Sequence, residues 1–248
     1  MQKRTITATL AIATLAAACS GTSGPSPTAT ARDATASPTA NPTATSSPTL
    51  QLTPSPNTVG LPDGWTRAQG DGFSIGLPDT WESVSAADVA DAGLFDAMRE
   101  ENPDAAAVID QAAAAMRTGQ IQLFAFDPGP RTAASGFANN VNVIHAGDPG
   151  DDDMAALAEQ VAQAVALQVP VNGRIRTSTT TLPAGEAAVL RYEWTINAPG
   201  GASFDVAVTQ YLVVSAGNGY IVTFSGLNED ARRDRSTWEA MAVSFRFG

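Results

Sequence analysis

The second half of the sequence contains four consecutive strand-like segments joined by very short turns. The turns read Pro-Ala-Gly, Ala-Pro-Gly-Gly and Gly-Asn-Gly. A parallel crossover needs about a dozen residues or more, so segments joined this closely must pair as antiparallel neighbours. The segments are Arg174–Leu182, Glu186–Ile196, Phe204–Ser215 and Tyr220–Gly226. The sequence therefore predicts an antiparallel meander.

The second of these segments also predicts how the sheet is covered. Successive side chains of a strand point to opposite faces, so its residues divide into two sets. One set is apolar and the other is mixed, which predicts one covered face and one mixed face. The apolar set is Ala188, Leu190, Tyr192, Trp194 and Ile196, and the mixed set is Val189, Arg191, Glu193 and Thr195.

The region before the meander predicts helices alternating with strands. Phe73, Ile75 and Leu77 alternate in a strand that Pro78 ends. Caps and apolar spacing predict helices over Ala86–Glu100 after Ser85, from Asn102 or Asp104 to about Arg117, over Asp152–Gln168, and over Glu229 to about Ala242. Two more strands are predicted at Gln120–Phe126 and Asn140–His145. The expected fold class is α+β, an antiparallel sheet flanked by helices.

The N-terminus predicts export and a lipid anchor. Lys3 and Arg4 precede an apolar stretch of about 13 residues, too short for the roughly 20 that span a bilayer. Cys19 follows a Leu-Ala-Ala-Ala string that resembles the bacterial lipobox, although the usual Leu position is Ala16. We expect residues 1–18 to be a signal peptide and Cys19 to carry diacylglyceryl and palmitate. The alternative is an ordinary signal that leaves a free thiol.

The next segment predicts a stalk. Residues 19–59 are almost wholly Ser, Thr, Pro, Ala, Gly and Asn, and such a composition cannot bury a core. A flexible linker of about 38 residues reaches roughly 35 Å. We therefore expect a disordered, lipid-anchored stalk that carries one globular domain, residues 60–248, clear of the extracytoplasmic membrane face.

Charge narrows the range of partners. The formal net charge is −11, and removal of Lys3 and Arg4 with the signal brings it to about −13. Such a field repels nucleic acid and anionic headgroups, so we expect no nucleic-acid partner and membrane contact only through the lipid. The cations beyond the signal are all Arg in an Ala-rich chain, a bias associated with high-GC genomes such as those of actinobacteria.

Two strings resemble a known family. Gly72–Trp81 reads GFSIGLPDTW, and Gly219–Phe224 reads GYIVTF before a helix and the closing Ser244–Phe247, SFRF. This order resembles the PsbP/Mog-type domain carried by bacterial lipoproteins of the LpqN and LpqT kind. The resemblance implies an α/β/α sandwich around an antiparallel sheet. It also implies a non-enzymatic binding or assembly role.

Few residues suggest chemistry. His145 is the only histidine and is interpreted as structural, and the acids from Asp148 to Asp153 are interpreted as a helix cap rather than a calcium site. We therefore predict no catalytic residues, no metal and no cofactor. The predicted binding residues are the loop-proximal Trp65 and Trp81 and the basic run Arg232, Arg233 and Arg235.

Three functions are compatible with the sequence. The first is a non-catalytic surface lipoprotein that binds an envelope or host protein. The second is a carrier for a small apolar or lipid ligand held between sheet and helices, since the Ala-rich helices could leave a cavity. The third is a hydrolase that uses paired carboxylates.

Overall fold

The computed structural model describes residues 60–85, 88, 93–101, 106–148, 153–197, 203–215 and 217–248. The predicted signal peptide, Cys19 and the predicted stalk lie outside these residues. Among the described helices, none is both long and apolar enough to cross a membrane.

Seven strands form the main sheet, in the order β3-β4-β5-β9-β8-β7-β6, and every pair in it is antiparallel. The strands are β3 (Glu82–Ser85), β4 (Leu123–Phe126), β5 (Asn140–Gly147), β6 (Arg176–Leu182), β7 (Gly185–Asn197), β8 (Ser203–Ser215) and β9 (Asn218–Leu227). Strands β6 to β9 are the four segments expected to follow one another along the chain. The predicted meander is confirmed.

A second, smaller sheet is built from both ends of the domain. Strands β1 (Trp65–Gly70) and β2 (Phe73–Pro78) form a hairpin, and β10 (Arg246–Phe247) pairs with the other edge of β2. Gly72 turns the hairpin with a φ of 72°, a left-handed conformation that glycine adopts readily. The last residues of the chain are thereby tied to the first strands of the domain.

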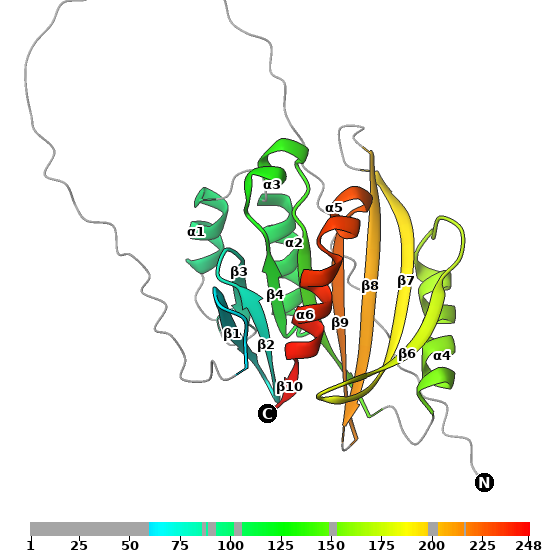
Figure 1. Ribbon diagram of the computed structural model, residues 1–248. Coiled ribbons are helices and arrows are strands. Elements are labelled where there is room, and N and C mark those ends of the chain that lie inside the picture. Colours follow the sequence, from blue (N-terminus) through cyan, green and yellow to red (C-terminus); the bar gives the residue numbers. More distant parts are fainter. Residues whose placement is uncertain are drawn as a thin grey trace, which may run out of the picture.

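Helices cover both faces of the main sheet (Figure 1). On one face lie α1 (Leu94–Glu101), α2 (Ala106–Arg117) and α4 (Met154–Gln168). On the other lie α5 (Asn228–Arg233), α6 (Arg235–Ser244) and the small sheet. The short helix α3 (Pro130–Ser135) lies between β4 and β5 in sequence. The predicted α+β class, an antiparallel sheet flanked by helices, is confirmed.

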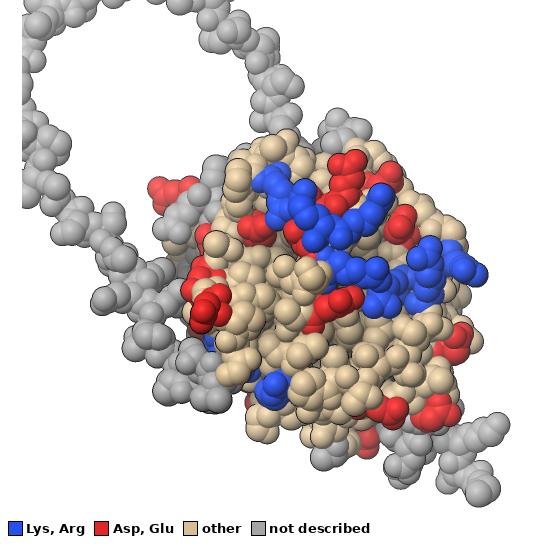
Figure 2. Space-filling model, in the orientation of Figure 1, with Lys and Arg blue, Asp and Glu red and all other residues tan. Residues whose placement is uncertain are grey.

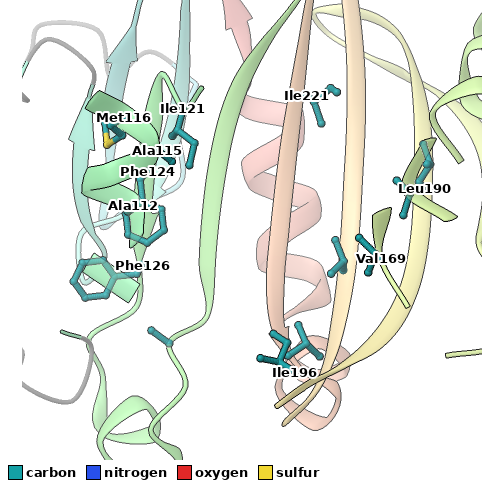
Figure 3. Packing of buried hydrophobic residues seen from close by; sticks show 14 of the residues in the cluster. Ala112, Ala115, Met116, Ile121, Phe124, Phe126, Val169, Leu190, Ile196 and Ile221 are labelled. Carbon is teal, nitrogen blue, oxygen red and sulfur yellow. The ribbon is translucent and has the colours of Figure 1, made fainter. Parts of the chain in front are cut away.

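The first hydrophobic cluster lies under α1, α2 and α4. Helix α2 contributes Ile109, Met116 and three alanines, and α4 contributes Leu157, Val161 and Val165. The labelled side chains in Figure 3 gather around α2 and β4 on one side and around β7, β8 and β9 on the other. The apolar set predicted on β7, from Ala188 to Ile196, belongs to this cluster as expected.

The opposite face of the sheet is also covered, as the α/β/α sandwich of the family resemblance implies, whereas the alternation along Glu186–Ile196 predicted a mixed face. Val189 of β7 and Tyr211 of β8 are buried there beneath Trp238 and Met241 of α6 and Phe73 of β2. The polar part of the predicted mixed set lies further along β7, where Arg191 is half-buried and Glu193 is exposed. The mixed face is therefore half core and half open surface.

Two predicted helices differ from the structure. The first has its described start at Leu94 rather than at the predicted Ala86, and most of residues 86–92 lie outside the described residues. Ser85 is the last residue of strand β3. The Ser85 hydroxyl and amide both donate to Asp88 Oδ2, so the residue still makes a local turn. The last helix is divided at Asp234 into α5 and α6.

Candidate functional site

A groove of about 400 Å³ opens between the C-terminal helices and the β6–β8 half of the main sheet. Arginine dominates its lining, with five guanidinium groups and only one carboxylate. The lining residues are Asn172, Gly173, Arg174, Arg176, Arg191, Tyr192, Glu193, Ala207, Val208, Thr209, Asn228, Ala231, Arg232, Arg235 and Trp238. We call this feature the arginine groove.

The meander and the helices bring the arginines together. Arg176 of β6 pairs directly with Arg191 of β7, and Arg191 pairs in turn with Thr209 of β8. Side chains opposed in this way share one face of the sheet, with Cα atoms about 4.5–5.5 Å apart. Arg232 and Arg235 follow at a spacing of three residues on α5 and α6. Charges from separate parts of the chain thus meet in one hollow.

Most of this positive charge is not neutralised. Among the described residues, Arg174, Arg176, Arg191 and Arg232 have no ion pair, whereas Arg235 pairs with Glu239 at 3.3 Å. Figure 2 shows the result as a band of basic side chains across the face that carries α5 and α6. A protein with a formal charge of −11 therefore presents a concentrated positive surface on one face.

The groove also contains buried polar atoms without partners. Arg191 Nε, Trp238 Nε1 and Asn228 Oδ1 are inaccessible to solvent and make no hydrogen bond among the described residues. Leaving a buried donor unpaired costs about 1–3 kcal/mol. Burial raises the pKa of the neighbouring Tyr211 hydroxyl, and the charge of Arg191 opposes that rise. The groove thus has a net excess of positive charge and of unused N–H donors.

Arg233, although next to Arg232 in sequence, does not belong to the groove. It pairs with Asp230 and, at 3.5 Å, with Asp234. Arg131 pairs with the same two aspartates at 3.8 and 3.0 Å and with Asp127 at 3.3 Å. This carboxylate cluster is therefore held by two guanidinium groups, an arrangement typical of a structural network.

The two tryptophans singled out from the sequence lie elsewhere. Trp65 is on β1 and Trp81 follows β2, and both are half-buried against the second hydrophobic cluster. Neither lines the arginine groove. The structure thus brings Arg232 and Arg235 together and leaves Trp65, Trp81 and Arg233 out.

A second hollow, of about 520 Å³, lies near the C-terminal residues and contains His145. The His145 ring is exposed, with its centroid 5.1 Å from that of Tyr220, and Tyr220 donates to Asp71 O at 2.8 Å. Asp71 and Ser215 also line this hollow, but no hydrogen bond joins either to His145 in the described part of the chain. A serine nucleophile activated by histidine requires that bond.

Of the predicted helix-capping acids from Asp148 to Asp153, the structure describes only Asp148 and Asp153. Asp153 caps α4 by accepting from Ala156 N at 2.8 Å, as the capping interpretation predicts. Residues 149–152 lie outside the described residues. Within the described ranges, no group of three or more His, Cys, Asp or Glu side chains is arranged to hold a metal ion.

Sequence reasoning missed Arg174, Arg176 and Arg191. Arg174 and Arg176 are separated by Ile175, and Arg191 lies between Leu190 and Tyr192, so none belongs to a continuous basic run. The register of β6 against β7 was the missing signal. Hairpin pairing through Pro183-Ala184-Gly185 sets Arg176 opposite Arg191, and that pairing depends on which two residues form the turn.

No protein-family model matches the chain, and no curated protein matches it. Several solved structures do match at low identity. The PsbP protein of the cyanobacterium Synechocystis is 14% identical, with 78% of this chain and 98% of that chain covered and a TM-score of 0.42. LpqN of Mycobacterium tuberculosis, described as involved in cell envelope biogenesis, is 14% identical, with 73% and 89% covered and a TM-score of 0.43.

The Ran-binding protein Mog1p of Saccharomyces cerevisiae is 9% identical, with 74% of this chain and 95% of that chain covered and a TM-score of 0.41. The names PsbP, LpqN and Mog, given by the sequence resemblance, recur among these matches.

Proposed function

We propose that this protein is a non-catalytic, lipid-anchored binding module of the bacterial envelope that presents the arginine groove to an anionic site on a protein partner. The lipid on Cys19 holds the protein on the extracytoplasmic face of the membrane. The stalk over residues 19–59 then lets the domain reach a partner roughly 35 Å away.

The arginine groove is the observation that carries this proposal. Arg174, Arg176, Arg191 and Arg232 converge from the segment before β6, from β6 and β7, and from α5, without an ion pair to a described acid. Guanidinium groups are the side chains best suited to carboxylate and phosphate recognition at interfaces. Maintaining four of them together in an acidic protein favours an anionic partner over a purely structural role.

The non-catalytic part of the proposal rests on how the reactive groups are arranged. His145 makes no hydrogen bond to Ser215 or Asp71 among the described residues, and Asp127, Asp230 and Asp234 are engaged by Arg131 and Arg233. A carboxylate pair held in ion pairs is not free to act as acid and base. Both observations support binding rather than hydrolysis.

The alternative, a carrier for an apolar ligand between sheet and helices, is less well supported. The middle of the sheet face beneath α2 and α4 carries the fully buried Asn140, Asn142, Gln210 and Thr223. Asn142 Nδ2 and Oδ1 and Gln210 Oε1 have no hydrogen-bond partner among the described residues. An apolar ligand placed there would leave those atoms unsatisfied.

Crosslinking in intact cells tests the proposal, with the full-length lipoprotein as bait. An Arg176→Gln/Arg232→Gln double variant removes two groove charges, and an Arg233→Gln variant removes one from the same helix outside the groove. We expect one specific envelope partner for the natural protein and for Arg233→Gln, and loss of that partner for the double variant. Unchanged crosslinking of the double variant would show that the groove is not the docking surface.

A further inference from the structure

The arginine groove has more charge than a single carboxylate can neutralise. Its lining contains five arginines and one glutamate, and the glutamate Glu193 is itself engaged by Asn228 Nδ2 at 3.2 Å. One carboxylate matches one guanidinium in a bidentate pair. Four of the arginines have no ion pair, and pairing each of them would require several carboxylates. Within about 400 Å³ those carboxylates would repel one another.

A phosphate ester satisfies the same arginines with one group. A phosphate monoester carries about −1.5 to −2 charges and three acceptor oxygens, which can accept from several guanidinium groups at once. Arg176 and Arg191 are adjacent across the strand pair, and Arg232 belongs to the helix that borders the same hollow. Three donors from three elements around one hollow suit an oxygen-rich tetrahedral anion.

The rest of the lining suits a small uncharged body attached to that phosphate. Asn172, Thr209 and Asn228 provide neutral polar groups, and Ala231 and the edge of Trp238 provide apolar surface. Trp238 as a residue is 2% exposed, and its indole Nε1 has no acceptor among the described residues. A hollow of about 400 Å³ falls within the range of roughly 300–1,000 Å³ in which proteins hold small ligands.

We infer that the arginine groove is a binding site for a phosphate monoester borne on a small, neutral, hydroxylated group, held by Arg176, Arg191 and Arg232. This inference rests on the proposed function, because it names the anionic group that the envelope partner presents. The net charge of −11 opposes approach to an extended anionic surface but not to one phosphate in a groove. We therefore expect the phosphate group to be carried by the envelope partner rather than by a lipid headgroup.

Calorimetric titration of the purified full-length protein in a neutral detergent tests the inference. The probes are glycerol 3-phosphate, inorganic phosphate and succinate. We expect glycerol 3-phosphate to bind more tightly than succinate by at least about tenfold, which corresponds to one charge-assisted hydrogen bond. Arg176→Gln should lower the affinity for glycerol 3-phosphate by at least about tenfold, and Arg233→Gln should change that affinity by less than about twofold.

The pH dependence provides an independent readout. The second phosphate pKa is about 6, and arginine stays charged, so lowering the pH from 7.5 to 5.5 should weaken glycerol 3-phosphate about fourfold as the dianion is lost. The affinity for succinate should fall less, because ordinary carboxyl groups titrate near pH 4 and stay ionised over most of this interval. Equal pH responses for the two probes would overturn the phosphate assignment.

A vesicle arm distinguishes the source of the phosphate. Vesicles of neutral lipid with 20% phosphatidic acid should not recruit a Cys19→Ser chain that lacks the anchor. Recruitment that Arg176→Gln abolishes would support the same phosphate chemistry and identify a headgroup as its source. Recruitment indifferent to Arg176 would count against the groove.

The two proposals can fail separately. No binding of glycerol 3-phosphate, or equal binding by the Arg176→Gln/Arg232→Gln variant, overturns the phosphate site. The crosslinking result with that same variant then still decides whether the groove docks a protein. If glycerol 3-phosphate binds but no partner is crosslinked, the phosphate site stands and the proposed binding of a protein partner is overturned.

Discussion

Arg176 and Arg191 stand directly opposite each other in the antiparallel pairing of β6 with β7. Both line the arginine groove, and neither has an ion pair among the described residues. Like charges directly opposed across a strand pair are destabilising by about 0.2–1 kcal/mol. Binding and stability therefore make opposite demands on this pair.

Replacing one member should separate the two demands. Arg176→Thr removes the repulsion and introduces a good strand former, so we expect the free energy of unfolding to rise by about 0.2–1 kcal/mol at low salt. Urea denaturation at low salt and at 1 M salt measures this. The gain should shrink at 1 M salt, where the screening length is about 3 Å. A loss of stability at low salt would show that Arg176 is held by an attractive contact.

The groove illustrates what sequence patterns can and cannot predict. Arg232 and Arg235 are visible as a basic run, but so is Arg233, which the aspartates at 230 and 234 take out of the site. Which arginine of a run faces the sheet depends on where the helix breaks at Asp234. Arg176 and Arg191 become neighbours only through strand register, a non-local property.

The fold was easier to predict from the sequence than the groove, because its sequence signals are local. Alternation on β7 and the short turns after Leu182 and before Tyr220 were sufficient to predict the meander. Strand β3 was missed because Ser85, interpreted as a helix cap, is the last residue of a strand, from which its hydroxyl donates to Asp88. Serine serves both roles, and only tertiary pairing distinguishes them.

The anchor prediction rests on a single thiol. Cys19→Ser should release the protein to the medium or block its processing, because serine cannot form the thioether that carries the diacylglyceryl group. Fractionation and intact mass of the natural chain and the variant measure this. Ala16→Leu, which completes the lipobox, is the matched control and should keep the protein on the membrane. Normal membrane retention of a processed Cys19→Ser chain would contradict the lipid assignment.

Gly72 and Gly119 form a matched pair for testing the hairpin. Both have a φ of 72°, but a Cβ at Gly72 would lie 2.6 Å from Tyr220 Oη, whereas Gly119 has open space around it. Alanine at either site should cost about 1–2 kcal/mol for the left-handed backbone. At Gly72 we expect a further loss of about 0.5–1.5 kcal/mol, as the Tyr220 bond to Asp71 O is displaced. Thermal denaturation of both variants measures the difference, and equal losses would show that Tyr220 yields without cost.

Arg131 is predicted to matter more for stability than Arg99. Each joins aspartates, but the carboxylates around Arg131 are 12–18% exposed and those around Arg99 are 55–69% exposed. Arg131→Gln should lower the free energy of unfolding by about 1–3 kcal/mol, because the largely buried Asp127 loses its cation and Asp230 and Asp234 are left to share Arg233. Arg99→Gln should change it by less than about 1 kcal/mol. Similar losses in urea denaturation would mean that burial does not strengthen the Arg131 network.

Asn142 is a polar residue whose removal should stabilise the protein. It is 0% exposed, faces the first hydrophobic cluster between Phe124 and Thr223, and neither of its amide atoms has a partner among the described residues. Leucine has a similar shape and no polar atom, so Asn142→Leu should raise the free energy of unfolding by about 1–3 kcal/mol. Gln210→Leu is the control and should gain less, because Gln210 Nε2 donates to Thr223 Oγ1 at 3.2 Å. A destabilised Asn142→Leu variant would mean that buried water satisfies this amide.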